Sequence, residues 1–258
     1  MYPRLFQFGQ IAIPTYGALT ALGLVAALVL AVRLARRFAL DPDRVWSLCL
    51  LGTLTTLIGA RLLLVLVYFH AFREHPVWVL GLTQVHTPWI LAMATVAGIA
   101  SALLYSLAEG LPLLAVLDTL APAAALAMIL NRIGAFFAGL DWGTPANLAW
   151  AVTYDRRLSV LWYGTPAYQK LHPVQLYDAA AALITLALLL YWLPRRTQPG
   201  ELAGAWLFLT GFAAAVFLPF RAAADPALSL PIAAAAVIAG GALWLRRRPT
   251  TASLPTPV

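Results

Sequence analysis

The chain has 258 residues, of which 62% are hydrophobic and only 10% are charged. Soluble domains carry roughly 25% charged residues, so a soluble fold of this composition would expose large apolar patches to water. The net charge of +7 does not indicate nucleic-acid binding, because the basic residues sit in short loops and not on one soluble face.

Seven apolar runs follow one another along the chain, and each is long enough to cross a bilayer as a helix. We expect these spans at about 14–32, 45–69, 88–107, 113–137, 173–193, 202–220 and 228–245. The fold class is therefore all-α, with a single polytopic membrane domain over residues 1–248, an external loop at about 138–171 and a flexible tail over 249–258. The first run is long enough to be a retained helix and not a cleaved signal peptide.

The basic residues of the loops predict the orientation of the chain, since cytoplasmic loops are enriched in Lys and Arg. The more basic side would carry Arg33, Arg36, Arg37, Arg44, Arg195, Arg196, Arg246, Arg247 and Arg248. The less basic side would carry Arg4, Arg73, Arg156, Arg157, Lys170 and Arg221. We therefore expect the N-terminus outside, the C-terminus in the cytoplasm and the loop 138–171 outside.

Charged side chains at membrane depth cost about 3 kcal/mol each on insertion scales, so they are candidates for function. Those in or near the expected spans are Arg61, Asp118, Arg132 and Asp178. Arg61 follows two small residues, and it could serve a site or extend to the membrane interface. Asp118 lies near the cytoplasmic end of its helix, where we expect it to cap or to pair.

Arg132 lies in the run Asn131–Gly143, whose three glycines allow close approach by a helix or a ligand. Its guanidinium could hold a phosphate in bidentate fashion. The alternative is a structural arginine that pairs with Asp118 or with helix carbonyls.

Polar residues also open the fifth span, in His172-Pro173-Val174-Gln175-Leu176-Tyr177-Asp178. Pro173 suits the first turn of a helix. Tyr177 alone would be ordinary in an aromatic belt, but His, Gln, Tyr and Asp within seven residues indicate a site. Tyr16-Gly17, early in the first span, could likewise belong either to an aromatic belt or to a site.

Together and in this order, these segments resemble the prolipoprotein diacylglyceryl transferases of bacteria. That family has Tyr-Gly in its first helix, Gly-Ala/Gly-Arg in its second and Asp-x-x-Ala-Pro before its signature. Its signature reads roughly Gly-Arg-x-Gly-Asn-Phe-x-Asn-Gly-Glu-x-x-Gly, and a His-Pro-x-Gln-Leu-Tyr-Glu follows. The matching residues here are Tyr16-Gly17, Gly59-Ala60-Arg61, Asp118 to Pro122, Arg132, Gly134, Phe136, Gly139, Gly143 and His172 to Tyr177.

The resemblance implies an enzyme of the bacterial cytoplasmic (inner) membrane. It would move the diacylglyceryl group of phosphatidylglycerol, or of another anionic phospholipid, to the lipobox cysteine of a preprolipoprotein signal peptide. A thioether would form and glycerol phosphate would leave, with no cofactor and no metal. The thiol must become a thiolate, which a base or a positive field would favour.

On the same basis we expect Arg132 to bind the phosphate, Tyr16 to line the site and Gly143 to shape it. Catalytic roles are expected for Arg132, Tyr16 and His86. Substrate-binding roles are expected for Arg61, Gly134, Asp141, Gly143, His172, Gln175, Tyr177 and Arg221.

Several polar residues of the family are replaced in this chain. Two asparagines and a glutamate of the signature are Ala135, Ala138 and Leu140, with Asp141 one place after Leu140. An arginine and a glutamate of the sixth helix are Ala214 and Leu218, and a His-Gly-Gly of the third helix is Ala92-Met93-Ala94.

Two hypotheses follow from these replacements. In the first, the chain is an active transferase in which His86, Asp141 or Arg221 replaces the lost groups. In the second, it is a divergent, inactive homologue that binds phospholipid or lipoprotein; a transferase for a different lipid group lies between the two.

Overall fold

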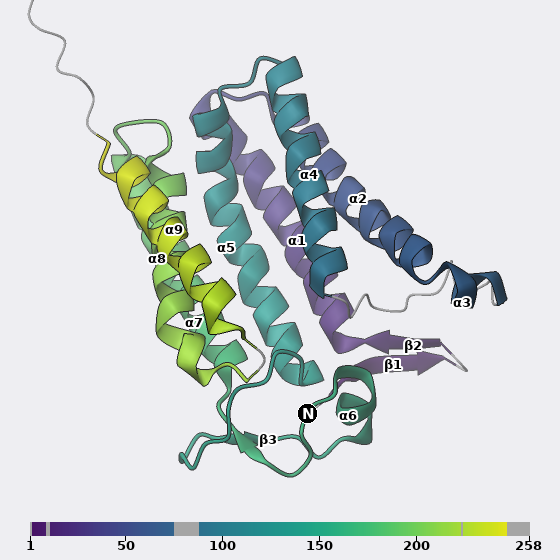
Figure 1. The fold of residues 1–258 in the computed structure, drawn as a ribbon. Helices are drawn as coiled ribbons and strands as arrows, with labels where there is room; N and C mark the ends of the chain where they lie inside the picture. The colour runs from purple at the N-terminus through teal and green to yellow at the C-terminus, as the bar shows by residue number, and fades with distance from the viewer. Residues whose placement is uncertain (1, 9–10, 75–87, 223, 247–258) are drawn as a thin grey trace, which may run out of the picture.

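A computed structural model describes residues 2–8, 11–74, 88–222 and 224–246, and within them seven helices are long and apolar enough to cross a membrane (Figure 1). This confirms the predicted number and the all-α membrane class. The helices are α1 (Thr15–Ala35), α2 (Pro42–Val67), α4 (Pro88–Ala108), α5 (Leu113–Ala138), α7 (Val174–Trp192), α8 (Glu201–Phe217) and α9 (Pro226–Trp244). The expected tail 249–258 lies outside the described residues.

Local sequence signals explain where several helices begin and end. Asp41 accepts a hydrogen bond from the backbone N–H of Asp43 at 3.0 Å, and Pro42 occupies the first turn of α2. Asp225 caps α9 in the same way, at 2.9 Å from the backbone nitrogen of Ala227. At its C-terminal end, α5 stops where Gly139 adopts a left-handed conformation with φ of 83°.

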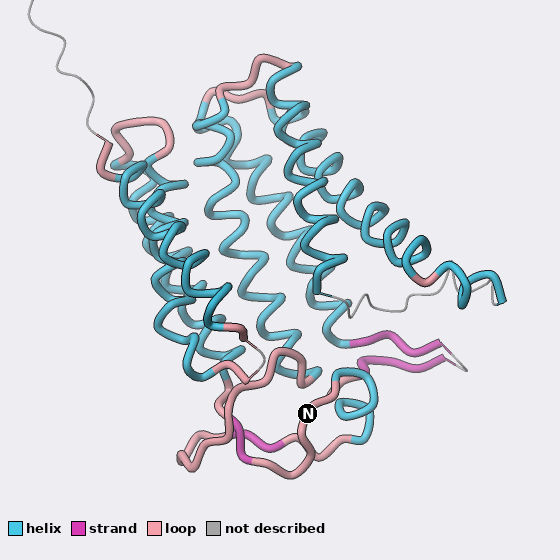
Figure 2. Tube along the Cα trace, viewed as in Figure 1, coloured by secondary structure: helices cyan, strands magenta, loops and turns pink. Residues whose placement is uncertain are grey.

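Short strands and short helices lie at the ends of the long helices (Figure 2). Two-stranded antiparallel pairs form between β1 (Arg4–Phe8) and β2 (Ile11–Pro14), and between β3 (Val152–Thr153) and β4 (Lys170–Leu171). Short helices are α3 (Phe69–Glu74), α6 (Arg157–Tyr163), η1 (Arg36–Phe38), η3 (Leu193–Arg195) and η4 (Leu218–Phe220). The residues before the first span therefore form a hairpin, which the apolar pattern did not predict.

The long helices pack chiefly as α1 with α5, α2 with α4, α8 with α9 and α5 with α7. Small residues permit these contacts, as is usual where helices associate in lipid. A Cβ added at Gly240 of α9 would lie 2.7 Å from the carbonyl oxygen of Gly204 in α8. Large apolar side chains on α2 and α4 are exposed, as a lipid-facing surface requires.

The connections α1–α2, α4–α5 and α7–α8 lie at one end of the bundle, and the segment between α5 and α7 lies at the other (Figure 1). We call these the connection end and the loop end. Asp118 is fully buried toward the connection end. It accepts hydrogen bonds from the backbone of Gly200 at 2.7 Å and Ala203 at 2.9 Å, and Arg196 Nε lies 2.7 Å away. The predicted capping or pairing role of Asp118 is confirmed.

Candidate functional site

The centre of the candidate site is Asp178, a buried carboxylate shared by two arginines. Arg221 Nη2 lies 2.7 Å from both of its oxygens, and Arg132 Nε lies 3.4 Å from Oδ2. The Asp178 side chain is 3% exposed, while the Arg132 and Arg221 side chains are 21% and 22% exposed. One buried negative charge therefore fixes two guanidinium groups, each of which still reaches solvent or ligand.

Asp141 is the second acidic partner of Arg132. Its Oδ2 accepts a hydrogen bond from Arg132 Nη1 at 2.9 Å. Unlike Asp178, the Asp141 side chain is 51% exposed, and its backbone has a positive φ of 54° just after the Gly139 turn. The alternative in which Arg132 pairs with Asp118 is wrong, because the acidic partners of Arg132 are Asp141 and Asp178.

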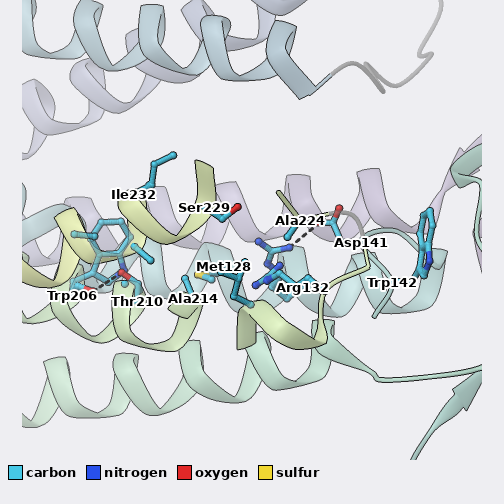
Figure 3. A pocket seen from close by; sticks show the side chains of 15 residues that line it. Met128, Arg132, Asp141, Trp142, Trp206, Thr210, Ala214, Ala224, Ser229 and Ile232 are labelled. Atoms are coloured by element: carbon cyan, nitrogen blue, oxygen red, sulfur yellow. Dashed lines mark hydrogen bonds and ion pairs between the residues drawn. The ribbon is translucent and has the colours of Figure 1, made fainter. Parts of the chain in front are cut away.

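Arg132 and Arg221 both line a hollow of about 540 Å³. Figure 3 shows Arg132 and Asp141 at one end of it and Trp206 and Thr210 at the other. Arg221 lies at the end of Arg132, since both arginines contact Asp178. The remaining wall is chiefly apolar and comes from Met128, Trp142, Gly211, Ala214, Leu218, Ala224, Ser229, Ile232, Ala233 and Ala236. A hollow with a cationic end and an apolar body suits an amphiphile with an anionic headgroup.

Helical periodicity separates the two faces of α5. Met128 and Arg132 face the hollow, whereas Asn131 and Gly134 face α1. Asn131 Nδ2 donates to the Tyr16 hydroxyl at 3.0 Å and to Thr20 Oγ1 at 3.1 Å. A Cβ at Gly134 would lie 3.3 Å from Tyr16 Cα. Tyr16 and Gly134 thus come together at the α1–α5 contact, one helix face away from Arg132.

Backbone pairing joins the loop after α5 to the end of α8. Gly143 forms a bridge with Arg221, and the backbone nitrogen of Thr144 donates to the Phe220 carbonyl at 2.8 Å. A Cβ at Gly143 would lie 2.7 Å from His172 Cβ, so only glycine fits where this loop passes the segment that precedes α7. Gly143 therefore lets the loop lie close to His172 while its backbone pairs with Arg221.

His172 and Tyr177 pack beside this junction. The His172 ring lies 4.8 Å from the Phe220 ring, and its Nδ1 is 3.3 Å from the Tyr177 hydroxyl. Trp150 Nε1 donates to the same hydroxyl at 2.8 Å. These rings support the backbone that carries Arg221.

Gln175 is buried and ties α7 to the loop. Its Nε2 donates to the Leu140 carbonyl at 2.7 Å and lies 3.4 Å from the Tyr154 hydroxyl. Burial raises the pKa of the Tyr154 phenol, against a smaller lowering by the hydrogen bond from Gln175, so Tyr154 stays neutral. A neutral Tyr154 can donate to the Phe136 carbonyl at 3.3 Å.

The remaining two predicted site residues are placed differently. Arg61 lies on α2, where its guanidinium carbon is 5.6 Å from the centre of the Phe72 ring. It is not among the residues that line the hollow. His86 lies outside the described residues.

Comparison with known proteins agrees with the sequence motifs. The model of the prolipoprotein diacylglyceryl transferase family matches residues 3–245. The chain belongs to this family. It is 29% identical over 218 residues to the phosphatidylglycerol–prolipoprotein diacylglyceryl transferase of Methylococcus capsulatus, an alignment that spans 81% of this chain and 77% of the relative.

Two further relatives carry the same name. The protein of Ruegeria pomeroyi is 31% identical over 236 residues, or 84% of this chain and 78% of the relative. The protein of Clostridium tetani is 28% identical over 198 residues, or 77% of this chain and 76% of the relative. The suspected family resemblance is therefore confirmed.

Several of the positions at which this chain lacks polar residues of the prolipoprotein diacylglyceryl transferase motifs lie in the wall of the hollow or in the buried core. Ala214 and Leu218, where the motif has an arginine and a glutamate, both line the hollow. Ala135 and Ala138, where it has asparagines, are fully buried. At positions 214 and 218 the wall of the hollow is therefore apolar, and the charged residues that line the hollow are Arg132, Arg221 and Asp141.

Sequence reasoning named Asp178 as a candidate charge at membrane depth and as part of the polar cluster that opens the fifth span, but it gave Asp178 no catalytic or binding role. It also did not find Met128, Trp206 or Thr210, since apolar and small polar residues in a span give no signal of which face they occupy. Within the described residues, no group of three or more His, Cys, Asp and Glu side chains is arranged to hold a metal ion.

Proposed function

We propose that this protein is a phosphatidylglycerol–prolipoprotein diacylglyceryl transferase of the bacterial inner membrane. The observation that carries this proposal is the pair Arg132 and Arg221, held by one buried carboxylate at the polar end of an apolar hollow. Membership of the family supports the same reaction.

In the proposed complex, the lipid phosphate binds between Arg132 and Arg221. Guanidinium groups bind phosphate with two parallel hydrogen bonds. Among the described residues, the polar contacts of Arg132 use Nε toward Asp178 and Nη1 toward Asp141, which leaves Nη2 for the phosphate. The diacylglyceryl part extends along Met128 toward Trp206. The arginine end of the hollow would thus select the anionic headgroup, and the apolar end would bind the acyl chains.

The reaction follows from this placement. The thiolate of the lipobox cysteine attacks the glyceryl carbon that bears the phosphate. A carbon–sulfur bond forms, the carbon–oxygen bond to phosphate breaks, and glycerol phosphate leaves with the electron pair. Negative charge grows on the phosphate in the transition state, so Arg132 and Arg221 would stabilise it more strongly than in the ground state.

The thiol proton needs an acceptor, and we propose His86 or the exposed Asp141 for that role. Tyr16 would line the site through its hydrogen bond with Asn131 on the α1 side of α5. Gly134, Gly143, His172, Gln175 and Tyr177 would act by holding α1, the loop and α7 in place. Arg61 would guide anionic headgroups at the membrane surface.

We further propose that the loop end faces outward, with the N-terminus outside and the C-terminus in the cytoplasm. The greater number of arginines at the connection end supports this orientation. It places Arg132 and Arg221 toward the outer leaflet, which a secreted signal peptide would reach.

The second candidate function is lipid or lipoprotein binding without transfer, or transfer of a different lipid group. The observation that favours it is the replacement of two hollow-lining positions by Ala214 and Leu218. Such a protein would keep the headgroup site while lacking polar groups that the motif supplies for chemistry.

Complementation distinguishes the two. The chain is expressed in cells depleted of their own transferase, and thioether-lipidated lipoprotein is measured. We expect lipidation to be restored, and Arg132→Ala to abolish it. Inserted, folded protein that restores nothing but co-purifies with phosphatidylglycerol in an Arg132-dependent way would establish the binding function instead.

A further inference from the structure

A second basic hollow lies at the opposite end of the bundle from Arg132. It measures about 400 Å³ and is lined by Arg37, Phe38, Leu193, Pro194 and Arg196. These residues come from the α1–α2 and α7–α8 connections, which Figure 1 shows at the connection end.

Basic residues at one end of a membrane protein are ordinary, because topology alone concentrates them there. Most of the arginines near this hollow are explained without a ligand. Arg44 pairs with Asp41 and Glu109, and Arg195 donates to the Tyr191 carbonyl at 2.7 Å while stacking on the Tyr191 ring. Charge by itself therefore identifies no site.

Arg196 differs because the fold fixes its guanidinium. Its Nε lies 2.7 Å from the buried Asp118 carboxylate and donates to the Gln198 carbonyl at 3.0 Å. Its guanidinium carbon lies 4.5 Å from the centre of the Phe38 ring. All of its polar contacts with described residues use Nε, so both Nη groups keep their donors available beside the hollow.

Arg37 completes the arrangement. It lines the same hollow, is exposed, and makes no hydrogen bond or ion pair with any residue in the described part of the chain. The backbone around it is well fixed, since Leu40 donates to the Ala35 carbonyl at 3.0 Å and Phe38 is buried. One guanidinium held in place and a second one free are suited to clamp a single multivalent anion.

The level of the hollow indicates the kind of anion. Trp192 and Trp244, the last residues of α7 and α9, meet edge to face with ring centres 5.0 Å apart. Tryptophan is enriched at the level of lipid headgroups. Leu193 and Pro194 follow Trp192 directly and Arg196 comes four residues after it. The hollow therefore lies at the level where phosphate groups of the adjacent leaflet are found.

We propose that Arg37 and Arg196 form a phosphate-binding site at the connection end, distinct from the Arg132 hollow. The phosphate is supplied by an anionic lipid headgroup or by free phosphate. The site is independent of the transfer reaction and requires only that the chain reside in a membrane.

The test counts bound lipid by native mass spectrometry on the full chain in detergent, with dioleoyl phosphatidylglycerol as the probe. Arg37→Gln is compared with Arg36→Gln, which removes the same charge from the neighbouring residue, one that does not line the hollow. We expect Arg37→Gln to weaken one binding event by about tenfold, and Arg36→Gln to leave it nearly unchanged. Arg132→Ala should remove a different binding event.

Two further arms identify the source of the phosphate. Diacylglycerol, which has the tails without phosphate, should show no difference between the two variants. Millimolar inorganic phosphate that displaces the Arg37-dependent lipid would identify a site for free phosphate, and lipid that resists displacement would identify a headgroup site. Equal lipid binding by Arg37→Gln and Arg36→Gln would overturn the proposal, as would an equal effect on diacylglycerol. Neither result would touch the transfer reaction, which complementation measures separately.

Discussion

Arg221, which directly follows η4 after α8, places Nη2 at 2.7 Å from both carboxylate oxygens of Asp178 on α7. The same carboxylate lies 3.4 Å from Arg132 on α5. Two helices, α5 and α7, and the segment that follows α8 are thus joined at one buried charge. This arrangement makes Asp178 as important to the fold as to the site.

Replacing Asp178 by asparagine should lower stability. The substitution leaves two partly buried guanidinium groups without their shared counter-charge, at a cost of about 1–3 kcal/mol. The melting temperature in detergent should fall clearly. Asp141→Asn is the matched control, because it removes an exposed partner of Arg132 and should change stability by less than about 1 kcal/mol. Equal melting temperatures for the two variants would contradict the central role of Asp178.

Asp141→Asn should strengthen lipid binding. Asp141 occupies Arg132 Nη1, so an incoming phosphate must displace it. Removing the competing charge should lower the KM for phosphatidylglycerol by roughly two- to tenfold, a gain of about 0.4–1.4 kcal/mol. Weaker binding would show that Asp141 contacts the substrate favourably and does not compete with it. A fall in kcat at unchanged KM would indicate that Asp141 accepts the thiol proton.

The double substitution Ala214→Arg and Leu218→Glu should restore polar groups to the wall of the hollow. Both positions line it, and a volume of about 540 Å³ leaves room for longer side chains. We expect lipidation in depleted cells to rise several-fold above the unsubstituted chain. The control is Phe212→Arg with Val216→Glu, two exposed positions of the same helix that do not line the hollow. A rise with the control pair as well would remove the hollow as the explanation.

Asp118→Ala should destabilise the connection end without changing lipid affinity at Arg132. Asp118 is buried and satisfies two backbone N–H groups at the start of α8, and its loss also leaves Arg196 unpaired. We expect a cost of about 3–5 kcal/mol. Asp225→Ala removes an exposed cap of α9 and should cost only about 1 kcal/mol. Thermal unfolding of both variants would reveal whether burial makes this difference.

Much of the fold was predictable because the bilayer imposes it. Seven apolar runs gave seven helices, and the ends differ by only a few residues. The first helix, for example, continues to Ala35, beyond the expected end at residue 32. Arg33 can remain in its last turn because a cation is favourable at a helix C-terminus. The β1–β2 hairpin was not predicted, because its short apolar strands resemble the span that follows.

The sequence was sufficient to predict most residues of the site, but not which of them form ion pairs with one another. Arg132, Asp141 and Arg221 were each expected, and the structure brings them to one hollow. The considered pairing of Arg132 with Asp118 could have been rejected by arithmetic, since fourteen residues of helix separate the two by about 21 Å. Asp178 was named as a candidate but given no role, because the sequence gives no sign that α5, α7 and the segment after α8 converge on it.

The exposed carboxylate of Asp141 also has a consequence for the end of the catalytic cycle. A site that holds phosphate through two guanidinium groups risks slow product release, since glycerol phosphate carries even more negative charge than the lipid. The Asp141 carboxylate already lies beside Arg132, so it can replace the departing phosphate without having to diffuse into the site. In the proposed enzyme, the group that an arriving headgroup must push aside is thus the group that helps to expel the departing product and ready the site for another turnover.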